Sequence, residues 1–184
     1  MSQGTKSRVK VGGSSGFKGL GEWALIILGA LLVAFVVKTF LVQAFYIPSL
    51  SMAPTLEVND RVLVNKLSYD LHDVRRGDVI VFRSPESSET KDLIKRVVGL
   101  PGDTVESRDG HMVVNGRMLE EPYLRPSVTT GPMQSRVIPA HHYFMMGDNR
   151  GNSSDSRVFG PIDQSLIIGR AFVKVWPVTE IAVL

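Results

Sequence analysis

The stretch WALIILGALLVAFVVKTFLVQAF, residues 23–45, decides the architecture of this 184-residue chain. Lys38 and Gln43 are its only strongly polar residues. About 20 apolar residues suffice for a helix to cross the hydrocarbon core of a bilayer, whereas a cleaved signal peptide has a shorter apolar region of roughly 7–15 residues. A buried core helix is the other alternative. We predict a single transmembrane helix over residues 22–45.

Charges on the N-terminal side of this run predict its orientation. Lys6, Arg8, Lys10 and Lys18 are opposed there only by Glu22. Cytoplasmic flanks of membrane helices carry the excess of Lys and Arg, so we expect the N-terminus in the cytoplasm and a single pass through the cell membrane. The predicted parts are a disordered cytoplasmic tail over 1–21, the helix, and an extracytoplasmic domain over 46–184.

The composition excludes several classes of function. The net charge is only +3 at pH 7, and much of that excess lies in the first twenty residues, so we expect no nucleic-acid partner. The chain has no cysteine, which excludes disulfides, thiolate metal sites and a cysteine nucleophile. The sequence lacks metal-binding and phosphate-binding motifs as well. It therefore predicts no metal or cofactor.

After residue 46 the pattern is one of short strands. The turn-like pairs Asp109-Gly110 and Asn115-Gly116 lie inside DTVESRDGHMVVNGRML, and such pairs are the strongest short-range signals of a β-hairpin. Further strands are predicted in DRVLVNKLSY (60–69), GDVIVFRSP (77–85), HYFMMG (142–147) and IIGRAFVKVW (167–176). We predict a mostly β fold with antiparallel sheets and irregular loops near 84–92 and 121–140.

Two hydroxyls directly follow the apolar run, in IPSLSMAPTL (47–56). Ser49 and Ser51 lie between Pro48 and Pro54, which favour an extended backbone. Side chains two residues apart in an extended segment point to the same side. A solvated linker is the alternative interpretation of this stretch.

A serine nucleophile here would need a base other than histidine. The four histidines, 72, 111, 141 and 142, have no catalytic or metal-ligand spacing, and lysine is the known alternative. Lys95 lies in the apolar run DLIKRVVGLPGD, and a buried lysine can lose its proton near neutral pH. The alternative is an ordinary lysine on the wet face of a strand. Two Ser-x-x-Lys matches, at 7–10 and 88–91, lack the motifs that normally accompany them.

A third stretch, GDNRGNSSDSRVFG (147–160), is dense in Gly, Asp, Asn and Ser. It reads either as a long surface turn or as a loop that orients other side chains. Together with PSLSMAPTL, RGDVIVFRSP and LIKRVVGLPGD, it resembles the four motifs of bacterial type I signal peptidase, in the order of that family and downstream of an apolar segment. The resemblance covers residues 44–175.

This resemblance implies a membrane-bound serine endopeptidase with the type I signal peptidase fold. It would cleave N-terminal signal peptides from exported preproteins after an Ala-x-Ala-like site, through an acyl-enzyme. Ser51 is implied as the nucleophile and Lys95 as the general base. The Ser49 hydroxyl and the Ser51 backbone N–H would form the oxyanion hole, and Ser153 would hydrogen-bond Lys95.

The resemblance also implies a supporting network and a substrate site. Asp155 would pair with Arg157 and with Arg96. Shallow apolar pockets for small substrate side chains would be lined by Ile47, Met52, Leu56 and Ile94. Exported preproteins and the lipid bilayer are the implied partners, with no obligate protein partner. The alternatives are a self-cleaving Ser/Lys repressor-type protease and an inactive, membrane-tethered binding module.

Overall fold

The computed structural model describes residues 16–36, 41–86 and 91–184, with side chains over 21–35 in the first helix. The chain divides into two compact units, Met1–Thr39 and Phe40–Leu184. The first unit contains helix α1, Gly16–Val36, and the second contains all of the strands described below.

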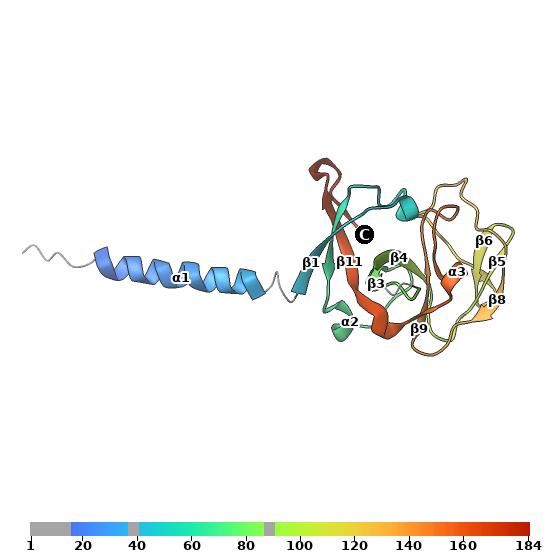
Figure 1. Cartoon of the computed structure of the whole chain (residues 1–184), viewed down its shortest axis with the longest axis horizontal. Helices are drawn as coiled ribbons and strands as arrows, with labels where there is room; N and C mark the ends of the chain where they lie inside the picture. The colour runs from blue at the N-terminus through green and yellow to red at the C-terminus, as the bar shows by residue number, and fades with distance from the viewer. Residues whose placement is uncertain (1–15, 37–40, 87–90) are drawn as a thin grey trace, which may run out of the picture. The chain divides into compact units, whose positions relative to one another are not determined.

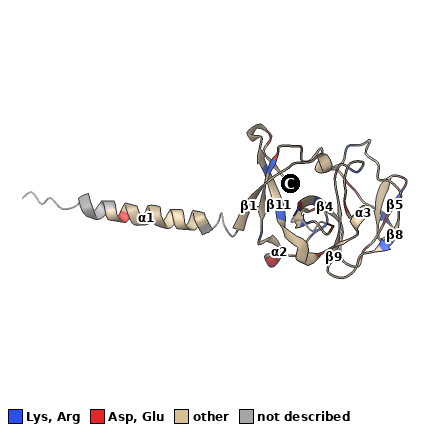
Figure 2. Cartoon of the chain, in the orientation of Figure 1, with Lys and Arg blue, Asp and Glu red and all other residues tan. Residues whose placement is uncertain are grey.

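Helix α1 is predominantly apolar. Glu22 is the one charged residue between 21 and 35 (Figure 2), and large apolar side chains from Trp23 to Phe35 are more than half exposed. No helix in the described residues combines the length and the apolar character needed to cross a membrane.

The boundaries predicted for this part of the chain were wrong at both ends. Residues 16–21, assigned to the tail, already belong to α1, and the rest of that tail lies outside the described residues. At the other end, Val42–Tyr46 is strand β1 rather than helix. It pairs along its whole length with β2, from Val42 opposite Asn65 to Tyr46 opposite Arg61. This pairing satisfies the backbone groups that face β2, and the Val, Phe and Tyr residues of β1 favour a strand.

The larger sheet has eight strands in the described residues and is antiparallel throughout. Its order is β1-β2-β11-β3-β4-β9-β10, with β12 also paired to β11 (Figure 1). The bounds are β1 Val42–Tyr46, β2 Arg61–Asn65, β3 Val79–Arg83, β4 Asp92–Gly99, β9 His142–Met146, β10 Ile162–Asp163, β11 Ile167–Trp176 and β12 Ala182–Val183.

A smaller antiparallel sheet lies at the end of this unit away from β1, in the order β7-β6-β5-β8 (Figure 1). Both predicted hairpins are confirmed: Asp109-Gly110 joins β5 to β6, and Asn115-Gly116 joins β6 to β7, all four with positive φ. Strand β8 lies inside the predicted 121–140 loop. The bounds are β5 Thr104–Arg108, β6 His111–Val114, β7 Arg117–Met118 and β8 Met133–Val137.

Short helical segments connect the strands. The strand predicted over 60–69 ends at Asn65 and is followed by a helical turn, so its last residues were assigned wrongly. The segments are η2 Leu50–Met52, α2 Ser68–Leu71, α3 Ser156–Phe159, η3 Gln164–Leu166 and η4 Val178–Glu180.

Strand β4 is held by all three hydrophobic clusters of the domain. Ile94 packs against the cluster that contains Val62 and Ala171. Val97 belongs to a second cluster, and Val98 to the third, which it shares with the small sheet. A strand fixed from several sides is a rigid platform for the polar residues between these contacts, Lys95 and Arg96.

Candidate active site

Ser51 lies in a 3₁₀ turn rather than in an extended segment. Ser49 is extended, at φ −138° and ψ 158°, but Leu50–Met52 form η2, which the Ala53 N–H closes by donating to the Leu50 carbonyl at 3.1 Å. The extended backbone predicted for the whole Ser49–Ser51 segment is therefore wrong at Leu50 and Ser51. The two hydroxyl oxygens are nevertheless close, at 3.3 Å, with Ser51 buried and Ser49 exposed.

Lys95 reaches this turn from the middle of β4. Its Nζ lies 2.7 Å from the Ser51 Oγ and donates to the Ile94 carbonyl at 2.9 Å. Lys95 is 3% exposed, and this burial lowers the pKa of its side chain to about 8, against the opposing attraction of Asp155 and Asp148. The ordinary value is 10.5. As the pH rises through about 8, Lys95 therefore becomes an amine with a free lone pair beside a hydroxyl.

Ser153 does not make the predicted hydrogen bond to Lys95 in this structure. Its Oγ is buried and has no hydrogen-bond partner within the described residues. Ser153 nevertheless lies next to the turn that contains Ser51, because a Cβ added to Gly147 would collide with both the Ser153 side chain and the Ser51 carbonyl.

Asp155 holds the loop that follows β9. It is fully buried and accepts from Arg157 Nε at 2.8 Å and from the Gly147 N–H at 3.0 Å. Burial tends to raise the pKa of the Asp155 carboxyl, but these donors outweigh it and lower that pKa below its ordinary value. The predicted Asp155–Arg157 pair is thus present in the structure.

The predicted pair between Asp155 and Arg96 was wrong. Arg96 instead forms a two-pronged ion pair with Asp148, at 2.9 Å and 2.7 Å, and both side chains are buried. Thr55 donates to the same carboxylate at 2.6 Å, and the Tyr123 ring stacks on the Arg96 guanidinium at 4.0 Å. The sequence analysis missed Asp148, which lies in the 147–160 stretch but has no distinctive spacing from Arg96.

A second buried ion pair supports the same loop. Arg150 pairs with Glu121, donates to Thr130 Oγ1 at 2.8 Å and donates to the Gly147 carbonyl at 3.2 Å. Glu121 lies in the connection between β7 and β8 of the small sheet, and the Tyr123 hydroxyl donates to it at 2.8 Å. The small sheet is thereby tied to the loop beside Ser51. Nothing in the sequence singled out Glu121.

The Ser51 and Lys95 side chains open into a cavity of about 460 Å³. Strand β4 forms one wall, and its residues 92–95 pair only with β3 among the described strands, because pairing with β9 starts at Arg96. Within the described residues, this part of β4 therefore has no strand paired to its second side, and it borders the cavity. The lining residues are Pro48, Ser49, Leu50, Ser51, Lys91, Asp92, Leu93, Ile94, Lys95, Asn152 and Ser154.

The predicted pocket residues divide between this cavity and the core. Ile94 lines the cavity. Ile47, Met52 and Leu56 are not among the residues that line it, because their side chains are buried at 2% exposure or less and pack in the cluster with Val62 and Ala171. In this structure these three side chains support the turn from within the core.

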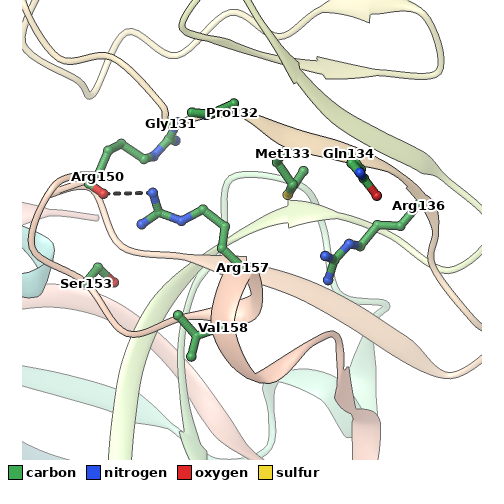
Figure 3. Close-up of a pocket in the computed structure, with 9 residues that line it drawn as sticks. All are labelled: Gly131, Pro132, Met133, Gln134, Arg136, Arg150, Ser153, Arg157 and Val158. Atoms are coloured by element: carbon green, nitrogen blue, oxygen red, sulfur yellow. Dashed lines mark hydrogen bonds between the residues drawn. The ribbon is translucent and has the colours of Figure 1, made fainter.

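A second cavity, of about 440 Å³, adjoins the 150–158 segment (Figure 3). In Figure 3 the Arg157 guanidinium points to the Arg150 carbonyl, to which it donates at 2.7 Å, while Arg136 comes from β8. This cavity is lined by Gly131, Pro132, Met133, Gln134, Arg136, Arg150, Ser153, Arg157 and Val158. Ser153 thus borders the arginine-lined cavity, whereas its neighbours Asn152 and Ser154 line the Ser51 cavity.

Comparison with known proteins identifies relatives along most of the chain. The family model described as "Signal peptidase, peptidase S26" matches residues 20–176. The chain is 42% identical to a probable signal peptidase I-2 of Synechocystis sp. over 161 residues, covering 84% of this chain and 72% of that protein. It is also 42% identical to a signal peptidase I of Leptolyngbya laminosa over 174 residues, covering 90% and 81%. A solved signal peptidase I of Enterococcus faecalis aligns with a TM-score of 0.48 at 32% identity, over 54% of this chain and 97% of that chain.

Proposed function

The chain belongs to the signal peptidase family, peptidase S26, and is a serine peptidase; from this premise we propose that it removes N-terminal signal peptides from exported preproteins with Ser51 as nucleophile and Lys95 as general base. The observation that carries the proposal is the 2.7 Å separation of the Lys95 Nζ and the Ser51 Oγ in a buried site. A nucleophile within hydrogen-bond reach of its base is the arrangement that covalent catalysis requires.

The proposed reaction has two stages. The neutral Lys95 amine takes the Ser51 hydroxyl proton while the oxygen attacks the scissile carbonyl carbon. The tetrahedral intermediate collapses as the resulting ammonium donates that proton to the leaving amine, which leaves an ester between Ser51 and the signal peptide. Lys95 then takes a proton from water as the water oxygen attacks the ester carbonyl carbon. The second tetrahedral intermediate collapses as the Lys95 ammonium returns that proton to the Ser51 oxygen, and the signal peptide leaves as a carboxylic acid that ionises in water.

Two donors are proposed to stabilise the oxyanion: the Ser49 hydroxyl and the Ser51 backbone N–H. The Ser49 Oγ lies 3.3 Å from the Ser51 Oγ, so it is close to the position that the carbonyl oxygen takes during attack. The Ser153 hydroxyl is proposed to bond and orient Lys95 during the cycle, because its Oγ is buried and lies beside the same loop backbone as the Ser51 carbonyl.

The free edge of β4 is the proposed docking site of the substrate backbone. An extended signal peptide can pair with residues 92–95 as an added strand. It would then lie between this edge and the segment Pro48–Leu50, with its reactive carbonyl at Ser51. We propose that Ile94 and its apolar neighbours in the cavity accept the small side chains of an Ala-x-Ala-like site.

Membrane anchoring through the N-terminal region is part of the proposal. It is supported by the apolar run of residues 23–45 in the sequence and by the exposure of the apolar side chains of α1. The catalytic domain would lie on the extracytoplasmic side, as the upstream lysines and arginine suggest.

Incubation with a purified preprotein tests the whole proposal. The full chain in detergent should release a mature protein whose new N-terminus follows an Ala-x-Ala-like sequence, and the Ser51→Ala variant should release none. A cut elsewhere in the preprotein, or equal cleavage by the variant, would contradict the proposal. Self-cleavage of the chain without processing of the preprotein would favour the repressor-type alternative.

A further inference from the structure

We propose that Asn149 is a positioning residue that aims the oxyanion donor of Ser51. The inference rests on the proposed role of Ser51 and assigns a role to a residue of the 147–160 stretch that takes part in none of the ion pairs described for the site. Asn149 touches the nucleophile turn twice. Its side-chain amide donates to the Leu50 carbonyl at 3.1 Å, and its backbone N–H donates to the Ser51 carbonyl at 3.1 Å.

The first contact acts on the oxyanion donor through a rigid unit. The Leu50 carbonyl and the Ser51 N–H belong to one peptide group, which is planar and points its oxygen and its hydrogen in opposite directions. A donor that fixes the oxygen therefore fixes the direction of the N–H. A hydrogen bond at the carbonyl also polarises the amide and strengthens the N–H as a donor.

The second contact fixes the next peptide group of the turn. The Ser51 carbonyl belongs to the Ser51–Met52 peptide, so Asn149 holds one peptide on each side of the Ser51 Cα. The Ala53 N–H also donates to the Leu50 carbonyl, at 3.1 Å. With both flanking peptides held, the direction of the Ser51 side chain toward Lys95 is restricted to its χ1 rotation.

Asn149 is well suited to this task because its own neighbours are fixed. Asp148 is fully buried in the pair with Arg96, and Arg150 is 3% exposed in the pair with Glu121. Gly147 lets the loop backbone approach the Ser51 carbonyl more closely than any residue with a Cβ would. Two buried ion pairs and one close backbone contact thus hold the Asn149 amide in place.

Two variants of the full chain test the inference. Asn149→Ala removes the side-chain donor but keeps the backbone one, and a slightly misdirected oxyanion donor should lower kcat about 10- to 100-fold. KM for a signal-peptide substrate should stay within about threefold, because the change acts on the transition state. Asn149→Asp has nearly the same size but turns an acceptor toward the Leu50 carbonyl, so its kcat should fall at least as far.

Ligand binding separates positioning from a general structural role. A peptide aldehyde ending in Ala forms a tetrahedral adduct with a serine nucleophile, and its affinity should fall in step with kcat in both variants. The affinity of the cleaved signal peptide should not change. The matched control is Gln164→Ala, which truncates an exposed amide on η3 and should keep the native kcat.

The outcomes are distinguishable. Cleavage by Ser51→Ala would refute the proposed function itself, whatever Asn149 does. If Ser51→Ala is inactive and a folded Asn149→Asp variant keeps the native kcat and aldehyde affinity, only the present inference is overturned. Thermal unfolding identifies the folded variants, and if Asn149→Ala does not fold, the near-isosteric Asp variant decides the question alone.

Discussion

The Lys95 nitrogen lies 2.7 Å from the Ser51 hydroxyl oxygen, although the two residues are 44 positions apart and come from different elements. The contact arises because η2 lies against β4, whose residues 92–95 pair only with β3 among the described strands. It links a strand held by three hydrophobic clusters to a short turn held by hydrogen bonds. The geometry therefore depends on how firmly the turn is fixed.

The first prediction concerns the pH dependence of cleavage. Only the neutral form of Lys95 accepts a proton, and burial lowers its pKa to about 8. We expect kcat/KM to rise with pH through about 8 and then to level off. Lys95→Arg should be inactive, because a guanidinium does not lose its proton in this range. A pH profile that follows a group with a pKa near 6.5 would exclude lysine as the base. Loss of cleavage on replacing a single histidine in a folded variant would exclude it as well.

Substitution of the two serines should reduce cleavage to different degrees. Ser51→Ala removes the nucleophile and should reduce cleavage to background. Ser49→Ala removes one oxyanion donor and should reduce kcat about 10²- to 10³-fold, while Ser49→Thr keeps a hydroxyl and should be less impaired. Steady-state kinetics on one substrate compares all three. Equal loss in Ser49→Ala and Ser51→Ala would contradict the division of roles.

Local patterns predicted much of the strand content but not the start of the domain. The hairpins at 109–110 and 115–116 were found because positive φ at both turn residues demands Asn, Asp or Gly. Strand β1 was missed because residues 37–45 continue the apolar run of α1 without a break. Strand β8, MQSRV, was missed because it is mostly exposed and polar. Its strand conformation depends on antiparallel pairing with β5, which its own composition does not predict.

The residues of the site likewise divide into those that the sequence predicted and those that it did not. The resemblance pointed to Ser51 and Lys95, which the structure brings together, and to the Asp155–Arg157 pair, which is local. The partner of Arg96 could not be predicted locally. Arg96 is opposite Met146 in the β4–β9 register, which brings Asp148, two residues later, within reach. Such a contact depends on strand register between distant segments, and a single sequence does not specify it.

Gly147 offers a test of how closely the loop must approach the nucleophile. A Cβ at this position would overlap with the Ser51 carbonyl and the Ser153 side chain. Gly147→Ala should therefore displace the turn, destabilise the domain by about 1–3 kcal/mol and lower kcat. Gly151→Ala is the matched control, because no atom lies within 4 Å of a Cβ added there. Equal effects of the two substitutions on unfolding and turnover would contradict this account.

The last prediction concerns the loss of stability caused by burying Lys95, the proposed base. Below pH 8 Lys95 is protonated in both the folded and the unfolded chain, and the folded state bears the full cost of the buried ammonium. Between about 8 and 10.5 the unfolded chain binds the proton and the folded one does not, so the free energy of unfolding rises with pH across this window.

Lys95→Met keeps a similar volume without the charge. It should abolish cleavage yet raise the free energy of unfolding at pH 6.5 by about 1–3 kcal/mol, and this gain should shrink as the pH approaches 10.5. Denaturant unfolding of both proteins at several pH values measures the difference. A variant that is less stable than the native chain at every pH would show that burial of Lys95 carries no such cost.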